Sequence, residues 1–199
     1  MGKVLIACVV LAAGFAVRFG GLKQLAEFHG KPLVKSAVDT ADESFADYVL
    51  LVVGNHSSEI LEKVQLGRAQ VVYNKDFKTG ISSSIRCGIA NLPDDCSGAI
   101  IMVADQPFLE SRHLDLMIEE FRKDPTRVIV LSHKGEPRNP VLIPKAMFHE
   151  LEKLKGDMGA RDLVRKSRNI KLVEISDSRV FFDVDTKDSL LEPRTENEN

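Results

Sequence analysis

A glycine-rich segment carrying two cations follows the first apolar run of the chain. Val4–Leu11 leads into Ala12-Ala13-Gly14, and the pair Gly20-Gly21 lies between Arg18 and Lys23. Glycines let backbone N–H groups approach an anion closely, an arginine forks onto phosphate oxygens, and a lysine adds a mobile point charge. The spacing fits neither G-x-x-x-x-G-K-[ST] nor G-x-G-x-x-G. The segment is either an ordinary tight turn or a cradle for a triphosphate, and its residues favour the cradle.

A single carboxylate ends another apolar run. Gly98–Val103 is followed by Ala104-Asp105-Gln106-Pro107. An unpaired charge at the end of a buried strand is costly, so a carboxylate there requires a cation. Asp105 therefore either binds a cation or caps the turn made with Pro107.

Two further carboxylates alternate near the end of the chain. In Val180–Thr186, Asp183 and Asp185 occupy the same face of an extended segment. They either contribute to a metal or polar site or lie at a solvated strand end.

A serine cluster follows Gly80 at the predicted start of a helix. Ser82 and Ser84 stand in Gly80-Ile81-Ser82-Ser83-Ser84. Free N–H groups and hydroxyls at a helix N-terminus can bind a nucleotide, although serines there are commonly simple caps. Both roles remain open on the residues alone.

The elements that position these residues alternate along the chain. Apolar runs predict strands and amphipathic runs predict helices. The predicted strands are 4–11, 48–53, 70–73, 98–103 and 127–132, and the predicted helices are 31–43, 57–64, 83–91 and 112–123. Such alternation predicts an α/β fold with a largely parallel sheet covered on both faces, whose ligands lie beyond the carboxyl ends of the strands.

The rhythm breaks over residues 133–165, which are rich in proline and glycine. We interpret them as an insertion that shapes an acceptor pocket, followed by short strands near 170–175 and 179–183. Residues 1–191 are expected to form a single domain, and the polar residues 192–199 a tail.

Composition excludes several classes of function. The 199 residues carry 27 Lys and Arg against 29 Asp and Glu, so a net charge of −2 gives no electrostatic case for binding a nucleic-acid polymer. No window reaches the roughly 18 apolar residues of a membrane span. Three cysteines without metal-ligand spacing indicate a reduced interior, so we expect a soluble, cytoplasmic protein. The five histidines show no partner pattern and are expected to be structural or on the surface.

Several of these motifs together resemble the nucleotidyltransferases that activate the molybdenum cofactor. L-A-A-G-F-A-V-R-F-G-G-L-K-Q-L resembles their signature loop, in the L-A-A-G form of the cytidylyltransferase branch; the guanylyltransferase branch usually has L-A-G-G. D-Q-P is similar to the family's metal-binding turn, G-x-S-x-S-I-R to its nucleotide-side motif, and Gly156–Arg161 to G-D-x-G-A-R. Two positions depart from the pattern: Arg138 replaces a glycine before Asn139-Pro140-Val141-Leu142, and Lys187 replaces a proline after Asp185.

The resemblance implies a three-layer, Rossmann-like α/β fold of the glycosyltransferase-A type with a mostly parallel central sheet. It also implies transfer of CMP from CTP to the phosphate of the molybdopterin cofactor with release of pyrophosphate. Arg18 and Lys23 would hold the β- and γ-phosphates, and magnesium would be bound by Asp105 and Asp185. The nucleotide-binding residues would be Leu11, Ala12, Ala13, Gly14, Arg18, Lys23, Asn55, Gly80, Ser82, Ser84 and Asp105. The acceptor-binding residues would be Gln106, Asn139, Pro140, Asp157 and Arg161.

Rival functions remain open on the sequence alone. A relative of the same class would use GTP, or would activate a sugar or polyol phosphate. A rival of another class is a non-catalytic protein that binds a nucleotide or pterin and delivers cofactor to a partner. The expected partner is a molybdoenzyme of the hydroxylase type.

Overall fold

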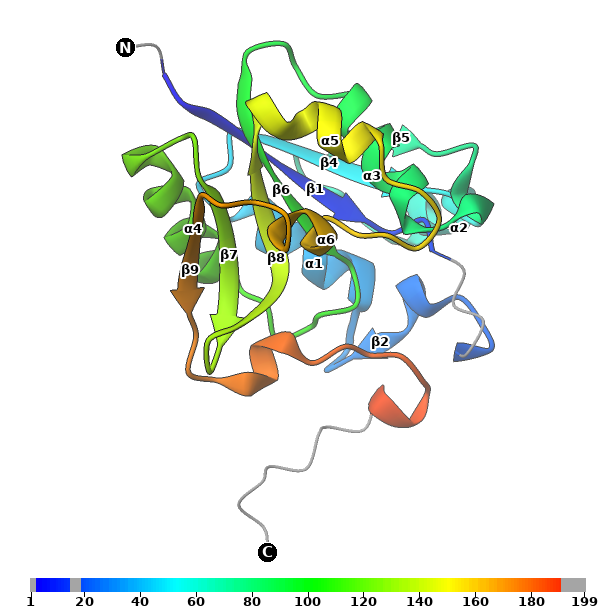
Figure 1. Cartoon of the computed structure of the whole chain (residues 1–199). Coiled ribbons are helices and arrows are strands. Elements are labelled where there is room, and N and C mark those ends of the chain that lie inside the picture. Colours follow the sequence, from blue (N-terminus) through cyan, green and yellow to red (C-terminus); the bar gives the residue numbers. More distant parts are fainter. Residues whose placement is uncertain (1–2, 15–18, 191–199) are drawn as a thin grey trace, which may run out of the picture.

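A computed structural model describes residues 3–14 and 19–190. A central sheet has the strand order β5-β4-β1-β6-β8-β7-β9, and helices cover both faces (Figure 1). The strands are β1 (Leu5–Leu11), β4 (Tyr48–Val53), β5 (Gln70–Tyr73), β6 (Cys96–Val103), β7 (Val128–His133), β8 (Glu136–Pro144) and β9 (Ile170–Glu174). Neighbouring strands are parallel except at β8, which runs antiparallel to β6 and β7. The predicted α/β class with a mostly parallel sheet is confirmed.

Alternating side chains of β1 divide the core into two halves. Ile6, Cys8 and Val10 pack with α1, α2 and α4 on one face, whereas Val9 and Leu11 pack with α3, α5 and α6 on the other. The chain is therefore apolar on both faces of its central strands, as buried parallel sheets require. The helices are α1 (Leu33–Asp42), α2 (Ser57–Lys63), α3 (Ile81–Ala90), α4 (Ser111–Lys123), α5 (Phe148–Glu152) and α6 (Arg161–Val164). A short hairpin, β2 (Glu27–Phe28) and β3 (Lys31–Pro32), precedes α1.

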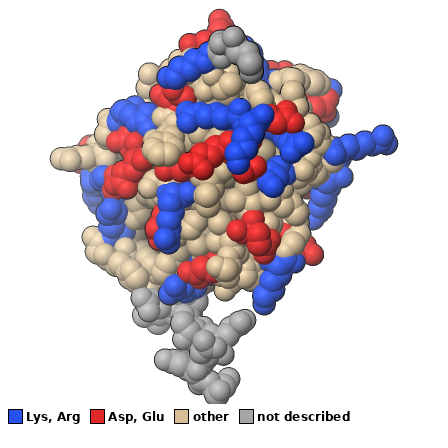
Figure 2. Space-filling view, turned by 90° about the vertical axis from the view of Figure 1, so that its left-hand side faces the viewer, with Lys and Arg blue, Asp and Glu red and all other residues tan. Residues whose placement is uncertain are grey.

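The surface beside α4 and β9 carries charges of both signs. Figure 2 shows basic and acidic side chains interspersed on this face. Lys123 and Lys171 both approach Glu120, at 2.5 and 3.9 Å, and Arg127 pairs with Asp124 at 2.9 Å. Basic side chains on this face are thus paired with acidic neighbours. None of the described helices is long and apolar enough to cross a membrane.

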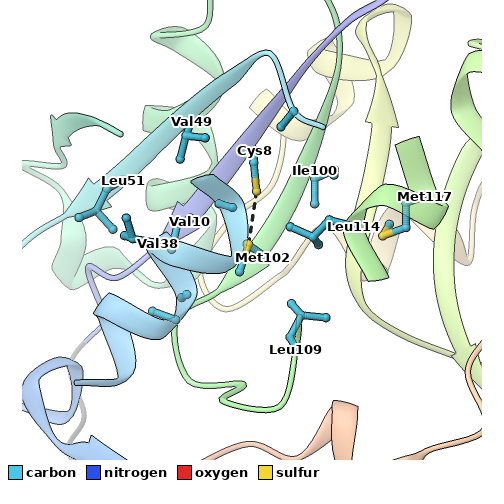
Figure 3. Close-up of a cluster of buried hydrophobic side chains, with 14 of the residues drawn as sticks. Cys8, Val10, Val38, Val49, Leu51, Ile100, Met102, Leu109, Leu114 and Met117 are labelled. Atoms are coloured by element: carbon cyan, nitrogen blue, oxygen red, sulfur yellow. Dashed lines mark hydrogen bonds between the residues drawn. The ribbon is translucent and has the colours of Figure 1, made fainter. Parts of the chain in front are cut away.

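Sulfur and branched aliphatic side chains fill the core between β1 and helices α1 and α4. Cys8 points at Met102, with 3.3 Å between Sγ and Sδ, and Val38 and Leu114 close the cluster from the two helices (Figure 3). Burial raises the pKa of the Cys8 thiol to about 12, so Cys8 is a core residue and not a nucleophile.

The segment 133–165 departs from the predicted insertion, because it contributes β8 to the middle of the sheet. Prolines made this strand hard to predict, since proline lacks the N–H that a sheet ladder uses. The structure accommodates Pro140 at an irregularity, where the pairing of β7 with β8 passes from Val130–Val141 to Leu131–Arg138. Asn139 and Pro140 lie in the resulting bulge.

The predicted strand 179–183 is wrong. Ser178–Phe181 forms a 3-10 turn begun by Asp177, whose side chain accepts a hydrogen bond from the Arg179 N–H. The apolar residues of this segment are buried without a partner strand. Val180 packs into the core, and Val184 packs into a separate small cluster. After β9 the chain passes along the edge where β7 and β9 end and continues toward the β2 hairpin (Figure 1).

Candidate functional site

The glycine-rich segment starts where β1 ends. The Ala12 N–H donates to the Val52 carbonyl at 2.9 Å, which prolongs the pairing of β1 with β4. The buried Gln24 amide donates to the carbonyls of Ala12 and Gly14 at 3.0 and 2.9 Å. Gln24 had no predicted role, although it belongs to the signature loop; it ties the first part of the segment to the turn Lys23–Leu25. Arg18 lies outside the described residues.

Lys23 is bound to the two carboxylates that the sequence predicts as metal ligands. Its Nζ donates to Asp105 Oδ2 at 2.6 Å and to Asp185 Oδ1 at 3.2 Å. The Lys23 side chain is only 14% exposed, against 27% for Asp105 and 59% for Asp185. The structure thus brings these three residues together, with the ammonium between the carboxylates instead of free for phosphate.

A third carboxylate adjoins this pair. Gln106 Nε2 donates to Asp183 Oδ1 at 3.0 Å. Desolvation, together with the negative charges of Asp105 and Asp185, raises the pKa of the Asp183 carboxyl to about 6. Asp183 is an exposed residue, so contact with solvent reduces its desolvation. The negative charges of Asp105 and Asp185 raise the pKa as well.

One backbone contact fixes this arrangement. The Val184 N–H donates to the Asp105 carbonyl at 3.0 Å, and the Val184 side chain is fully buried beside Phe19, Phe28 and Leu33. The end of the described chain is thereby held against the turn after β6, which brings Asp183 and Asp185 to Asp105.

The magnesium ion implied by the resemblance can be tested against these side chains. Within residues 3–14 and 19–190, no three His, Cys, Asp or Glu side chains form a ready-made metal site. Mg²⁺ is commonly held by one or two carboxylates together with waters and substrate phosphates, so a full protein cage is not needed. Asp105 Oδ1 is buried and has no hydrogen-bond partner among the described residues. The Asp105–Asp185 pair therefore fits a divalent cation that arrives with phosphate oxygens.

A cavity of about 370 Å³ opens beside this cluster at the carboxyl ends of β1 and β6. Its lining includes apolar backbone and side chains, two lysines and two aspartates. The lining residues are Leu11, Ala12, Ala13, Gly14, Lys23, Gln24, Leu33, Phe77, Lys78, Gly80, Ile81, Ser84, Val103, Ala104, Asp105 and Asp157. Its volume is in the range of small-molecule sites, and its position is the one expected for a ligand in a parallel sheet.

Gly80, at the start of α3, lies against the segment that contains Gly156 and Asp157, and both parts line the cavity. Its φ of +96° is a conformation that residues with a Cβ rarely adopt, and an added Cβ would collide with the Gly156 carbonyl. That carbonyl accepts the Ser82 N–H at 3.1 Å. The segment that contains Asp157 is thus held against the N-terminus of α3, and only glycine fits between them.

The serines of α3 make internal hydrogen bonds. Asn74 Nδ2 donates to Ser83 Oγ at 2.9 Å and to Ser84 Oγ at 3.1 Å, while Ser82 Oγ accepts from Arg86 at 3.3 Å. Ser84 lines the cavity, whereas Ser82 is fully buried outside the lining. Asn74 is buried and was missed; its position after β5 was the available signal.

The predicted acceptor residues are separated. Asp157 lines the cavity and Gln106 contacts Asp183, but Asn139, Pro140 and Arg161 lie outside the cavity lining, as does the predicted nucleotide residue Asn55. Pro140 is buried in the sheet, and Arg161 is exposed at the start of α6.

An aromatic group next to the carboxylates was also missed. Phe108 stands three residues after Asp105, and its ring meets Phe28 at 5.2 Å and Phe182 at 6.1 Å between centroids. His29 stacks on Phe28 at 4.3 Å. No pattern in the sequence pointed to this group, because its members come from three separate segments.

Comparisons with known proteins identify a family and several relatives. The family model described as MobA-like NTP transferase domain matches residues 8–171. A nicotine blue oxidoreductase of Paenarthrobacter nicotinovorans is 27% identical over 201 residues, which cover 96% of this chain and 98% of that protein. A probable molybdenum cofactor guanylyltransferase of Thermococcus sibiricus is 26% identical over 134 residues, covering 67% of this chain and 65% of that protein.

A solved structure is similar over most of its length. Rv0371c from Mycobacterium tuberculosis H37Rv has a TM-score of 0.83 at 27% identity, with 93% of this chain and 95% of that chain covered. The same protein has been solved in complex with manganese, and that structure is similar to this chain with a TM-score of 0.80.

Proposed function

The chain belongs to the MobA-like NTP transferase family and is a nucleotidyltransferase, and we propose that it moves CMP from CTP to the phosphate of a molybdopterin-type acceptor. An acceptor phosphate oxygen attacks the α-phosphorus, and the bond to the bridging oxygen breaks, which releases pyrophosphate. Negative charge must be neutralised on both the attacking and the leaving groups. No protein nucleophile is needed.

The charged residues of the cavity are assigned to this task. Lys23, which lines the cavity, and Arg18 stabilise the leaving pyrophosphate. Arg18 is assigned from the sequence, because it lies outside the described residues. Asp105 and Asp185 hold Mg²⁺, which when bound supplies Lewis-acid and template chemistry. The fit rests on Asp105 Oδ1, a buried oxygen to which no described residue donates a hydrogen bond.

The nucleoside is assigned to the part of the cavity lined by Ala13, Gly80 and Ser84. The Ala12 N–H and carbonyl are bound to Val52 and Gln24, so the backbone of Ala13 and Gly80 is assigned to the base, with Ala12 packing beside it. The Ser84 side chain lines the same space. Ser82 and Asn55 stay predictions for this role, because neither lines the cavity.

The acceptor side is the less defined part of the proposal. Asp157 lines the cavity and Gln106 binds the Asp183 carboxylate beside it, so both are retained as acceptor residues. Asn139, Pro140 and Arg161 stay predictions whose test is mutation. A pterin acceptor is consistent with the aromatic group around Phe108, since flat heterocycles pack on aromatic rings.

The observation that carries the proposal is the convergence of Lys23, Asp105 and Asp185 beside a cavity at the carboxyl ends of β1 and β6. The test is pyrophosphate release from CTP, GTP, UTP and ATP, each with and without molybdenum cofactor and Mg²⁺. We expect release that needs CTP, acceptor and metal together.

Other outcomes identify the rivals. Release from GTP with the same acceptor would indicate a guanylyltransferase, which the Thermococcus sibiricus relative favours by its name. Pyrophosphate release only with a sugar or polyol phosphate would show that such a phosphate, and not the molybdenum cofactor, is the acceptor. Nucleotide binding without turnover under any condition would favour a delivery protein. We further propose a cytoplasmic location, supported by three free thiols, and a molybdoenzyme of the hydroxylase type as recipient.

A further inference from the structure

Lys23 occupies an unexpected place for a residue that binds a triphosphate. Its ammonium lies 2.6 Å from Asp105 Oδ2 and 3.2 Å from Asp185 Oδ1, and its side chain is largely buried. Asp183, beside the same pair, brings a third carboxylate to within electrostatic range of Asp105. Among the described residues, Lys23 is the cation that is paired with Asp105 and Asp185.

We propose that Lys23 holds the cation position of the ligand-free site, so that a divalent metal binds tightly only once a triphosphate has drawn the ammonium away. This inference rests on the proposed function for the identity of the triphosphate. Lys23 is then a positioning residue in the free protein and a phosphate ligand in the complex.

Two physical effects oppose the metal while Lys23 remains in place. A divalent metal held by Asp105 and Asp185 would bind the carboxylate oxygens that the Lys23 ammonium contacts, in the space that the ammonium fills. The two cations would also repel each other strongly at such close range in a partly buried site. Asp105 and Asp185 can therefore serve the ammonium or the metal, but not both at full strength.

A triphosphate removes this conflict. Its oxygens offer the Lys23 ammonium new partners of higher charge, and the flexible four-carbon stem of lysine allows the head group to move while the backbone stays fixed. The backbone of the turn is anchored independently, because the neighbouring Gln24 side chain is bound to Ala12 and Gly14. The same phosphates supply the remaining metal ligands.

The experiment measures Mn²⁺ affinity without any nucleotide, by the electron paramagnetic resonance signal of the free ion. Four proteins are compared: the natural chain, Lys23→Met, Lys23→Arg and Lys78→Met. Lys78 is the matched control, because it lines the same cavity and its Nζ lies over the Phe77 ring, 5.9 Å from the ring centroid. We expect Lys23→Met to bind Mn²⁺ at least about tenfold more tightly, since removing a close cation favours another cation at the same oxygens. Lys23→Arg and Lys78→Met should stay near the natural chain.

The results separate the inference from its rivals. Unchanged or weaker Mn²⁺ binding by Lys23→Met would overturn it, and an equal gain in Lys78→Met would reduce it to a general effect of net charge. The double variant Lys23→Met/Asp185→Asn should lose the gain, because one of the freed carboxylates is gone. Circular dichroism checks the fold, and Lys23→Gln gives a second measurement if Lys23→Met is unfolded. Absence of turnover with every nucleotide would remove the proposed function but leave these affinities standing.

Discussion

At the scale of single residues, Asp105 shapes the site through its backbone as well as through its charge. Its carboxylate accepts Lys23, its carbonyl accepts the Val184 N–H, and its charge helps to raise the pKa of Asp183. Its remaining carboxylate oxygen is buried and has no partner within the part of the chain that the structure describes. The backbone of Asp105 fixes the end of the described chain, whereas its side chain determines the electrostatics of the site, and a substitution can separate the two roles.

Asp105→Asn is expected to reduce turnover by orders of magnitude while leaving the circular dichroism spectrum unchanged. The amide keeps the shape and the backbone contact but loses the charge that a metal and Lys23 need. The pKa of Asp183 should fall below about 6, because a neighbouring negative charge that raises it has been removed. Carboxyl NMR titration measures this, with Asp157→Asn as a cavity-lining control. An unchanged pKa of Asp183 would contradict the electrostatic coupling.

Ala13→Gly is expected to weaken the preference for CTP over GTP. Ala13 lines the cavity and is almost fully buried, so its methyl group both narrows the space for a base and packs into the core. A methyl-sized change is worth roughly 1–3 kcal/mol of discrimination. The measurement is kcat/KM for the two nucleotides in both proteins. A natural chain that prefers GTP would contradict the cytidylyl assignment and leave nucleotidyl transfer in place.

At the scale of elements, α4 shows how a buried histidine serves structure alone. Glu110 precedes the helix, and the Glu110 N–H donates to His113 Nδ1 at 3.0 Å while the Glu110 side chain accepts from the His113 backbone. Nδ1 must be unprotonated to accept this bond. Burial, followed by the charge of Arg112, lowers the pKa of His113 below its usual range. This agrees with the structural role expected of the histidines.

The stability of the protein should therefore fall on mild acidification in a way that depends on His113. The unfolded chain takes up a proton near pH 6.5, whereas the folded chain takes it up only at lower pH. The contribution is present above about pH 6.5 and is lost as the pH falls toward the lowered folded pKa. His113→Gln removes this titration. Urea unfolding between pH 7.5 and 5 should show a shallower decline for the variant, and parallel declines would contradict the assignment.

The elements also show what the sequence could predict and what it could not. Strands β1, β4, β5, β6 and β7 and helices α1 to α4 were predicted to within a few residues, because their periodicity reflects burial on one or both faces. β8 was missed because its prolines argue against a central strand, and a bulge at Asn139-Pro140 resolves the conflict. Residues 179–183 were mistaken for a strand because alternation predicts burial of alternate side chains, but not a hydrogen-bonded neighbour.

At the scale of the whole molecule, the site joins segments far apart in the chain. Lys23 lies 82 residues from Asp105 and 162 from Asp185. The sequence predicted each residue as functional, Lys23 and Asp105 from their places after apolar runs and Asp185 from the family resemblance. It could not predict that the lysine binds the two aspartates, because that contact depends on the path of the chain after β9. Gln24 and Asn74 were missed for the same reason, because each donates hydrogen bonds to groups that only the folded chain brings near it.

This path makes the last described segment part of the site, and two truncations should separate its contribution from that of residues 192–199. A chain ending at Asp183 loses the buried Val184 side chain, the hydrogen bond to the Asp105 carbonyl and the Asp185 carboxylate. Burial of one valine is worth about 2 kcal/mol, so the melting temperature should fall by at least about 4 °C, and turnover should be lost with it. A chain ending at residue 191 is the control and should keep both, as expected if residues 192–199 form a tail outside the domain. Calorimetry and the pyrophosphate assay measure the two effects. Equal melting temperatures for the two truncations would show that the contact between Val184 and Asp105 contributes nothing to stability.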